Sequence, residues 1–167
     1  YNLTTQGKSY TSAEFVKYIN TLVSNQPIIS IEDPFAEDDW SAWQDFIKVC
    51  PKKLQVLGDD LLTTNLDRLN KAIADKSANA ILIKANQNGL VTSTLNVLKQ
   101  ARANNFNTVV SARSGENEDS WLADLATGWN AGQIKVGSTH GSERNAKWNR
   151  LLEFEATEST KFTNPFN

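Results

Sequence analysis

Acidic and basic side chains recur in this sequence at the ends of short apolar segments. The most unusual is Lys84, because a lysine that follows an apolar segment (residues 80–83) is costly to remove from water unless a nearby group requires it. The same placement recurs at four further segment ends: Glu32 with Asp33, Asp59 with Asp60, Arg113 with Ser114, and Lys135. Two segments therefore supply carboxylates and three supply cations.

This set of side chains suits a site that binds a hard metal ion and a phosphorylated anion. Glu32 and Asp59 offer only oxygen donors, which favours Mg²⁺, and one histidine and one cysteine are too few for a zinc cluster. Arg113 beside Ser114 can bind a phosphate, the arginine through its bidentate fork. A lysine close to a dication and to another lysine is favoured in its neutral form and can act as a base. The set predicts proton abstraction next to a carboxylate, with the metal offsetting the enolate charge.

Each residue also has an ordinary structural interpretation. An acid that follows a strand often caps the next helix, as Asp33 could. Lys84 could extend along the surface to water. Arg113 could pair with Glu116 or Glu118, which follow it closely. The coincidence of five segment ends, rather than any one residue, favours the functional interpretation.

The segments between these residues predict a regular alternation of strands and helices after one leading helix. That helix should begin at a capping box, Thr11 to Glu14. The expected strands are 28–31, 54–57, 80–86, 108–111 and 133–136. Helices should cover 39–50 and 91–103 and surround Trp121 and Trp129, and two further helices should be capped by Thr64 and by Ser142. Strands that alternate with helices predict an α/β fold with a parallel sheet, buried on both faces, whose carboxyl ends meet where ligands bind. Five strands are fewer than a closed barrel needs, so the sheet is either open or part of a barrel.

Composition sets the broad class of the protein. The chain has 167 residues, 40% hydrophobic and 22% charged, which suits one folded domain. No apolar segment approaches the ~20 residues of a membrane-spanning helix, and the net charge of −2 gives no nucleic-acid footprint. The single Cys50 and the lack of a visible secretory signal favour the cytoplasm, with no membrane and no nucleic acid among the expected partners.

Seven short motifs in this chain, in order and at matching spacing, resemble those of the enolase (phosphopyruvate hydratase) family. They are SIEDPF at 30–35, DDW at 38–40, GDDL at 58–61, LIKANQ at 82–87, SGENED at 114–119, GQIK at 132–135 and SER at 142–144. The resemblance covers residues 26–155. It implies the second part of an enolase-type TIM-like (β/α) barrel, with about five βα units after a leading helix, incomplete on its own. Residues 1–155 would form the partial barrel domain and 156–167 a polar tail.

The resemblance also implies a reaction, the Mg²⁺-dependent dehydration of 2-phosphoglycerate to phosphoenolpyruvate in glycolysis, usually by a homodimer or a larger assembly. The roles it implies are Lys84 as the base, Glu32 and Asp59 as metal ligands, Ser111, Arg113 and Ser114 as the substrate loop, and Lys135 against the substrate carboxylate. The family's third metal carboxylate and its glutamate acid have no counterpart in this sequence.

Two departures from the family pattern support a different role. Ala112 stands where the family has a histidine, and residues 137–141 differ from the family's proline- and arginine-containing loop. They favour the alternative of a catalytically impaired, enolase-like structural or scaffold subunit. A third interpretation, another lyase or racemase of the enolase superfamily, is weaker because residues 114–119 resemble enolase itself.

Overall fold

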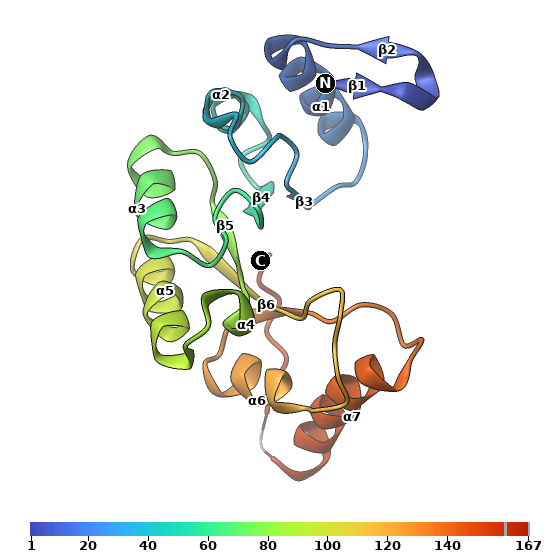
Figure 1. Ribbon diagram of the computed structural model, residues 1–167, viewed down its shortest axis with the longest axis vertical. Helices are drawn as coiled ribbons and strands as arrows, with labels where there is room; N and C mark the ends of the chain where they lie inside the picture. Colours follow the sequence, from blue (N-terminus) through green and yellow to red (C-terminus); the bar gives the residue numbers. More distant parts are fainter. Residues whose placement is uncertain (159, 167) are drawn as a thin grey trace.

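Five parallel strands form a curled sheet in the computed structural model, which describes residues 1–158 and 160–166 (Figure 1). The strands are β3 (Ser30–Glu32), β4 (Gln55–Gly58), β5 (Ala80–Ile83), β6 (Asn107–Ser111) and β7 (Gly132–Lys135). They pair in sequence order, β3-β4-β5-β6-β7, each parallel to the next. The sheet is curved like part of a barrel wall, so the expected half-barrel is confirmed.

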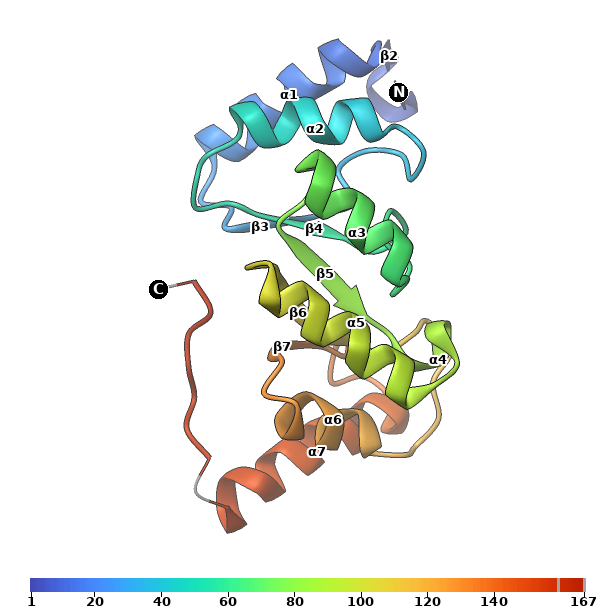
Figure 2. The same cartoon turned by 90° about the vertical axis from the view of Figure 1, so that its left-hand side faces the viewer.

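Helices connect the strands and cover the convex side of the sheet, as Figure 2 shows for α3 and α5. The helices are α1 (Ser12–Asn25), α2 (Trp40–Val49), α3 (Leu66–Asp75), α4 (Ala85–Asn88), α5 (Val91–Ala103), α6 (Trp121–Gly128) and α7 (Ser142–Thr157). A small hairpin of β1 (Asn2–Leu3) and β2 (Lys8–Ser9), joined by a 3₁₀ turn (Thr4–Gln6), precedes α1 and was not predicted. Two-residue strands are too short to show any periodicity in a sequence.

The leading helix begins as the capping box predicted. The Thr11 hydroxyl accepts the N–H of Glu14, and the Glu14 carboxylate accepts the N–H of Thr11. Phe15 and Ile19 then pack into the core, where Phe15 contacts Phe35 edge to face. The same aromatic cluster continues from Phe35 to Trp43 on α2, which anchors the first two helices on the sheet.

Alternate residues of the strands face different surroundings, even where consecutive residues are all apolar. Val56, Ile81 and Val110 belong to the large core beneath the helices. A separate small cluster lies on the concave face: Leu57, Ala80, Leu82 and Val109. This alternation with period two decides which side chains reach the barrel interior.

A polar layer lies on the concave face at the amino ends of the strands, and no sequence pattern predicted it. Gln55 is its centre: its amide nitrogen donates to Ser30 (2.9 Å), and its carbonyl oxygen accepts from Asn107 (3.0 Å) and Gln133 (2.8 Å). The buried amide of Gln55 thereby has hydrogen-bond partners for both its nitrogen and its oxygen, as buried polar groups require. Four strands are thereby linked across the interior.

Two predicted helix caps and one predicted strand end were wrong. The side chain that caps α3 belongs to Asn65, because the Thr64 hydroxyl accepts the N–H of Lys84 instead. Strand β5 ends at Ile83 rather than at residue 86, because α4 begins immediately after Lys84. Helix α7 has Gly141 at its N-cap, and the Ser142 hydroxyl donates to Glu118.

Helix α7 runs to Thr157, two residues beyond the predicted end of the barrel domain. The described part of the tail turns back toward the amino ends of the strands, where Pro165 and Phe166 share a hollow with Lys52 and Lys53 (Figure 2). The predicted tail, 156–167, includes residues 159 and 167, which lie outside the described residues. Within the described part of the chain, no helix has the length and apolarity needed to cross a membrane.

Candidate active site

The predicted site residues share one face because they continue the inward alternation of the strands. Glu32 follows Ser30, Asp59 follows Leu57, and Lys84 follows Leu82, each at a spacing of two. Parallel pairing then places the strand ends side by side: Gly58 is in register with Ile81, and Ser111 with Lys135. The residues therefore meet at the carboxyl edge of the half-barrel, where ligands bind in folds of this kind.

Lys84 and Asp59 form a close ion pair at this edge. The Lys84 Nζ lies 2.7 Å from Oδ1 and 2.6 Å from Oδ2 of Asp59. The two side chains are only 10% and 12% exposed. Gly58 precedes the aspartate, and a β-carbon there would lie 2.7 Å from Leu62 Cγ, so the close approach of this loop depends on glycine.

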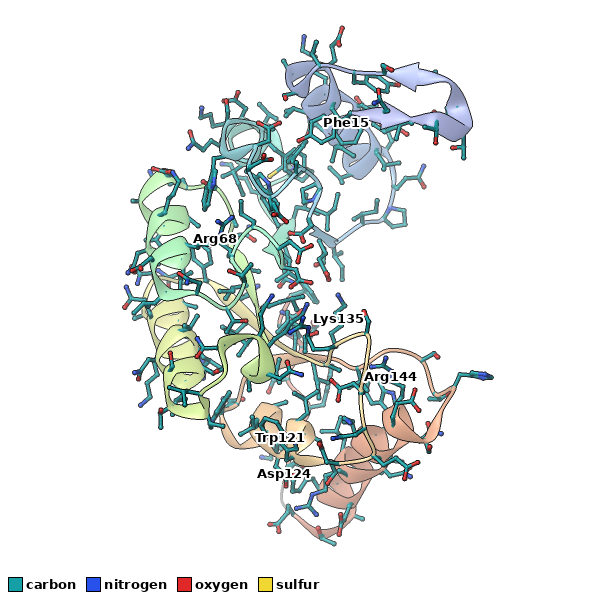
Figure 3. The ribbon with its side chains drawn as sticks, in the orientation of Figure 1. Phe15, Arg68, Trp121, Asp124, Lys135 and Arg144 are labelled. Carbon is teal, nitrogen blue, oxygen red and sulfur yellow. The ribbon has the colours of Figure 1, made fainter. Side chains whose placement is uncertain are left out.

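Lys135 forms the second ion pair of the site, with Glu32. The pair joins the ends of the two edge strands of the sheet, β7 and β3. Figure 3 shows Lys135 on the open, concave side of the molecule. This pair is far more accessible: the lysine side chain is 47% exposed and the glutamate 32%. Each of the two predicted metal carboxylates is thus matched to one of the two predicted lysines.

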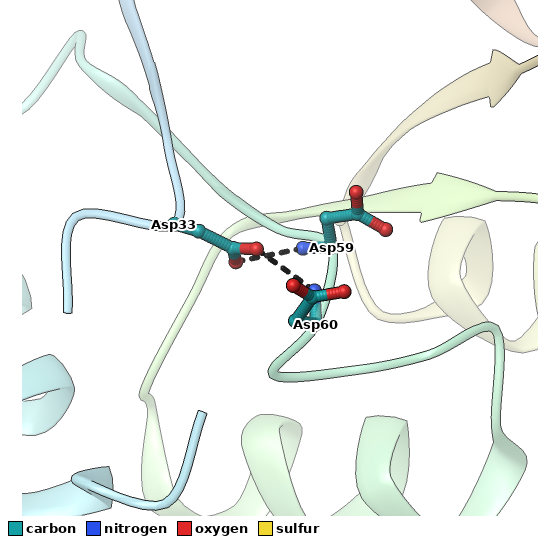
Figure 4. Close-up of side chains that lie close together, drawn as sticks. All are labelled: Asp33, Asp59 and Asp60. Atoms are coloured by element: carbon teal, nitrogen blue, oxygen red, sulfur yellow. Dashed lines mark hydrogen bonds between the residues drawn. The ribbon is translucent and has the colours of Figure 1, made fainter. Parts of the chain in front are cut away.

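Asp33 brings a third carboxylate near Asp59, but it has a structural task of its own. Oxygens of Asp33, Asp59 and Asp60 all lie within 4.8 Å of one another (Figure 4). Asp33 accepts the backbone N–H of Asp59 (2.9 Å) and of Asp60 (2.8 Å), so it caps the loop after β4 rather than the next helix. Burial raises the pKa of the Asp33 carboxyl, against the opposing effect of those two hydrogen bonds.

The loop after β6 presents Arg113 with an exposed side chain. The Arg113 guanidinium makes no hydrogen bond or ion pair with the residues that the structure describes, whereas the backbone N–H of Arg113 donates to Glu116 Oε1 at 2.7 Å. The predicted pairing of its side chain with Glu116 or Glu118 is therefore wrong. Arg113 and Ser114 are exposed, whereas Ser111 is buried and donates to the carbonyl oxygen of Ala112.

A cavity of about 390 Å³ lies beside this loop, lined in part by Asn86, Ser111, Asn117 and Trp121. Ser111 lines this cavity although the residue is only slightly exposed. Ala112, at the end of β6, is 8% exposed and belongs to the core beneath the helices. The substitution for histidine thus lies at a buried position.

Sequence reasoning missed two side chains that shape the site, Thr64 and Lys147. Thr64 lies in the left-handed region at φ 50°, and its hydroxyl accepts the N–H of Lys84 at 2.9 Å. Lys147 is fully buried on α7 and pairs with Glu116 at 3.2 Å. The one available signal was that Lys147 lies four residues before Leu151, on the apolar stripe of its helix.

The donor set fits a hard divalent cation. Glu32 and Asp59 present carboxylate oxygens from neighbouring parallel strands, and the acidic cluster around Asp59 contains only oxygen donors. The exposed position of Glu32 leaves this edge of the site open. These two residues are therefore the ones that would hold a metal, with Asp33 committed to backbone hydrogen bonds.

The fold and the charged strand ends define an α/β protein of the (β/α) barrel class. The model of the enolase C-terminal TIM barrel domain matches residues 1–163, and the chain belongs to the enolase family. Two enolases of Ureaplasma parvum serovar 3, from strains ATCC 27815 and ATCC 700970, are each 54% identical to it over 155 residues. The aligned region is 93% of this chain and 35% of each relative, so the chain spans about a third of their length.

Proposed function

We propose that the protein containing this chain is an enolase that dehydrates 2-phosphoglycerate to phosphoenolpyruvate with Mg²⁺. The observation that carries the proposal is the buried pair of Lys84 and Asp59 at the carboxyl edge of the half-barrel. A buried lysine is expensive to maintain for structure alone, and ionisable groups held out of water in a cleft are candidates for a functional site. Membership of the enolase family supports the same reaction.

In this proposal the residues of the chain divide the work between binding and proton transfer. Lys84 removes the proton from C2 to give the enolate of the substrate carboxylate, and the electron pair then forms the double bond between C2 and C3 when the hydroxyl leaves from C3. The acid that protonates this hydroxyl belongs to another part of the protein. Arg113 and Ser114 bind the phosphate, and Lys135 faces the substrate carboxylate.

Glu32 and Asp59 would hold the Mg²⁺, which when bound supplies the positive charge that offsets the developing enolate. Ser111 completes the substrate loop next to Arg113. We place the protein in glycolysis and in the cytoplasm, as a homodimer or larger assembly. Its substrate is a small phosphorylated carboxylate, with neither nucleic acid nor membrane as a partner.

The test follows phosphoenolpyruvate formation from 2-phosphoglycerate by the full-length protein with Mg²⁺. Lys84→Met should abolish both turnover and solvent deuterium exchange at C2, because the exchange needs only the base. Lys99→Met, which removes an exposed lysine from the outer helix α5, is the matched control and should retain both. Wild-type protein with neither turnover nor a Mg²⁺-dependent rise in melting temperature would refute the proposal.

Ala112 supports a second candidate, an enolase-like subunit that serves as structure or scaffold. The family's histidine is absent at this buried strand end, beside the arginine that would bind phosphate. Restoring it by Ala112→His separates the candidates. If the wild type turns over slowly and the histidine raises kcat/KM by roughly tenfold or more, as a restored hydrogen-bond donor would, the protein is an impaired enzyme.

A further inference from the structure

Helix α7 supplies cations that hold the loop between β6 and α6 (residues 112–120, the β6 loop). Arg144 lies in its first turn, and Figure 3 shows this side chain directed toward the loop. Its Nη1 donates to the carbonyl oxygens of Arg113 (2.9 Å) and Val136 (3.0 Å), and its Nη2 to that of Ser114 (2.9 Å). The backbone on either side of the Arg113–Ser114 peptide bond is therefore attached to α7.

Lys147, one turn further along α7, provides the deeper attachment. It is 0% exposed, and it is the buried residue of a helix whose other side chains all retain some exposure. Its Nζ donates to the carbonyl oxygen of Asn117 at 2.6 Å and lies 3.2 Å from Glu116 Oε2 and 3.9 Å from Asp119 Oδ1. All three partners belong to the β6 loop, so this buried charge is neutralised entirely by the segment that it holds.

Glu116 connects Lys147 to Arg113. One carboxylate oxygen of Glu116 pairs with Lys147, and the other accepts the N–H of Arg113 at 2.7 Å. The glutamate side chain is 11% exposed, so water competes little for either contact. A continuous path of two contacts thus joins the buried ammonium to the backbone of Arg113.

The other side of the β6 loop gives little support. Gly115, Glu116, Asn117 and Asp119 line the cavity of about 390 Å³, so this side of the loop faces open space instead of packed side chains. Gly115 has no atom within 4 Å of the position that a β-carbon would occupy. The position of the loop is consequently determined from the side of α7.

We propose that Lys147 is a positioning residue that, through Glu116, fixes Arg113 where it can bind the phosphate of the substrate. The proposal rests on the proposed function for the role of Arg113, and it adds a role for a side chain outside the site. Phosphate binding by a guanidinium depends on direction as well as charge. Loss of the Lys147 contact allows the loop to relax toward the cavity and turns Arg113 away from the phosphate.

The experiment compares Lys147→Met and Glu116→Gln in the full-length protein. Both should raise KM for 2-phosphoglycerate, and weaken the binding of inorganic phosphate, by roughly tenfold or more, the scale of loss for a displaced binding group. The change in kcat should be smaller, because Arg113 contacts the phosphate in both the ground and the transition state. Lys147→Arg keeps the cation and should recover most of the affinity.

Arg150→Met is the matched control, one turn further along α7. Arg150 pairs with Asp124 of α6 at 2.8 Å and makes no hydrogen bond or ion pair with the β6 loop. Its loss should lower the melting temperature and leave the affinity for inorganic phosphate unchanged. The comparison therefore separates positioning of the loop from stability of the helix.

Limited trypsin digestion at the Arg113–Ser114 bond tests the loop without requiring turnover. Cleavage should be slow in the wild type and in Arg150→Met, and faster in Lys147→Met and Glu116→Gln. If the wild type lacks enolase activity but shows this pattern, the proposed function fails and the positioning role stands. If Lys147→Met does not fold, the nearly isosteric Glu116→Gln decides. Unchanged cleavage, phosphate affinity and KM in Glu116→Gln would overturn the proposal.

Discussion

The Nζ of Lys84 lies within 2.7 Å of both carboxylate oxygens of Asp59, at the end of two neighbouring parallel strands. The predicted base and a predicted metal ligand are therefore each other's countercharge. The second pair of the site, Lys135 with Glu32, repeats the arrangement in a much more accessible position. The two pairs combine the same chemistry with opposite exposure, which makes their contributions to stability distinguishable.

Asp59→Asn is expected to destabilise the protein far more than Glu32→Gln. The first change leaves the 10% exposed Lys84 without its carboxylate, and an uncompensated buried charge costs about 3–5 kcal/mol. The second breaks an accessible pair, worth about 1 kcal/mol or less. Urea denaturation of the full-length variants measures the difference, and both variants should lose activity under the proposed function. Equal destabilisation by the two changes would contradict the assignment of a buried and an exposed pair.

Two consecutive threonines before α3 have opposite expected effects when they are replaced. Thr63 (φ 49°) and Thr64 (φ 50°) both occupy the left-handed region, which is costly for β-branched residues. Thr63→Asn should stabilise the protein by about 1 kcal/mol, because asparagine tolerates this conformation. Thr64→Val should destabilise it by about 1–3 kcal/mol, since the N–H of Lys84 loses its buried acceptor.

Thermal and urea unfolding of the full-length protein check both changes, with Thr64→Ser as the control that keeps the hydroxyl. Under the proposed function, Thr64→Val should also lower kcat, because the backbone that carries Lys84 is released. Because valine is β-branched as well and keeps the strain, a stabilising Thr64→Val would show that the hydrogen bond of the Thr64 hydroxyl contributes nothing to stability.

The parallel sheet and the gathering of the charged residues at one edge followed from the sequence, because parallel strands place every carboxyl end at the same edge. Family membership and the half-barrel were likewise expected from the motifs and are confirmed. The roles of Glu32, Asp59, Lys84 and Lys135 remain predictions that their geometry supports. Their pairwise matching was not foreseen, because the register between strands decides which acid meets which base.

The features that sequence reasoning missed depend on contacts between distant segments. Thr64 resembles a helix cap until its hydroxyl is found at the N–H of Lys84, twenty residues away. Ser142 likewise resembles a cap, yet it donates to Glu118. Lys147 looks like one more charged residue on a polar helix, and only the folded β6 loop supplies the partners that bury it. A local sequence pattern cannot reveal such partners, because they lie on distant segments that reach the side chain only when the chain is folded.

The capping box of α1 predicts a specific dependence of stability on pH. Hydrogen bonds from the backbone N–H and the hydroxyl of Thr11, both 2.8 Å, lower the pKa of the Glu14 carboxyl. Its pKa in the folded protein is therefore below the unfolded value of about 4.3. The stabilisation is complete above the unfolded pKa and is lost as the pH falls through the folded one.

Glu14→Gln keeps a side chain that can accept from Thr11 but removes the titration. The variant should be less stable than the wild type at neutral pH, and the gap should close as the pH falls from about 5 toward 3, because the wild-type carboxyl then becomes neutral as well. Urea midpoints of the full-length proteins across this range give the measurement. Glu155→Gln, an exposed glutamate on α7, is the control and should show a gap that does not change with pH in this way. A Glu14→Gln gap that stays constant or widens in acid would show that the capping box gains nothing from the charge of Glu14.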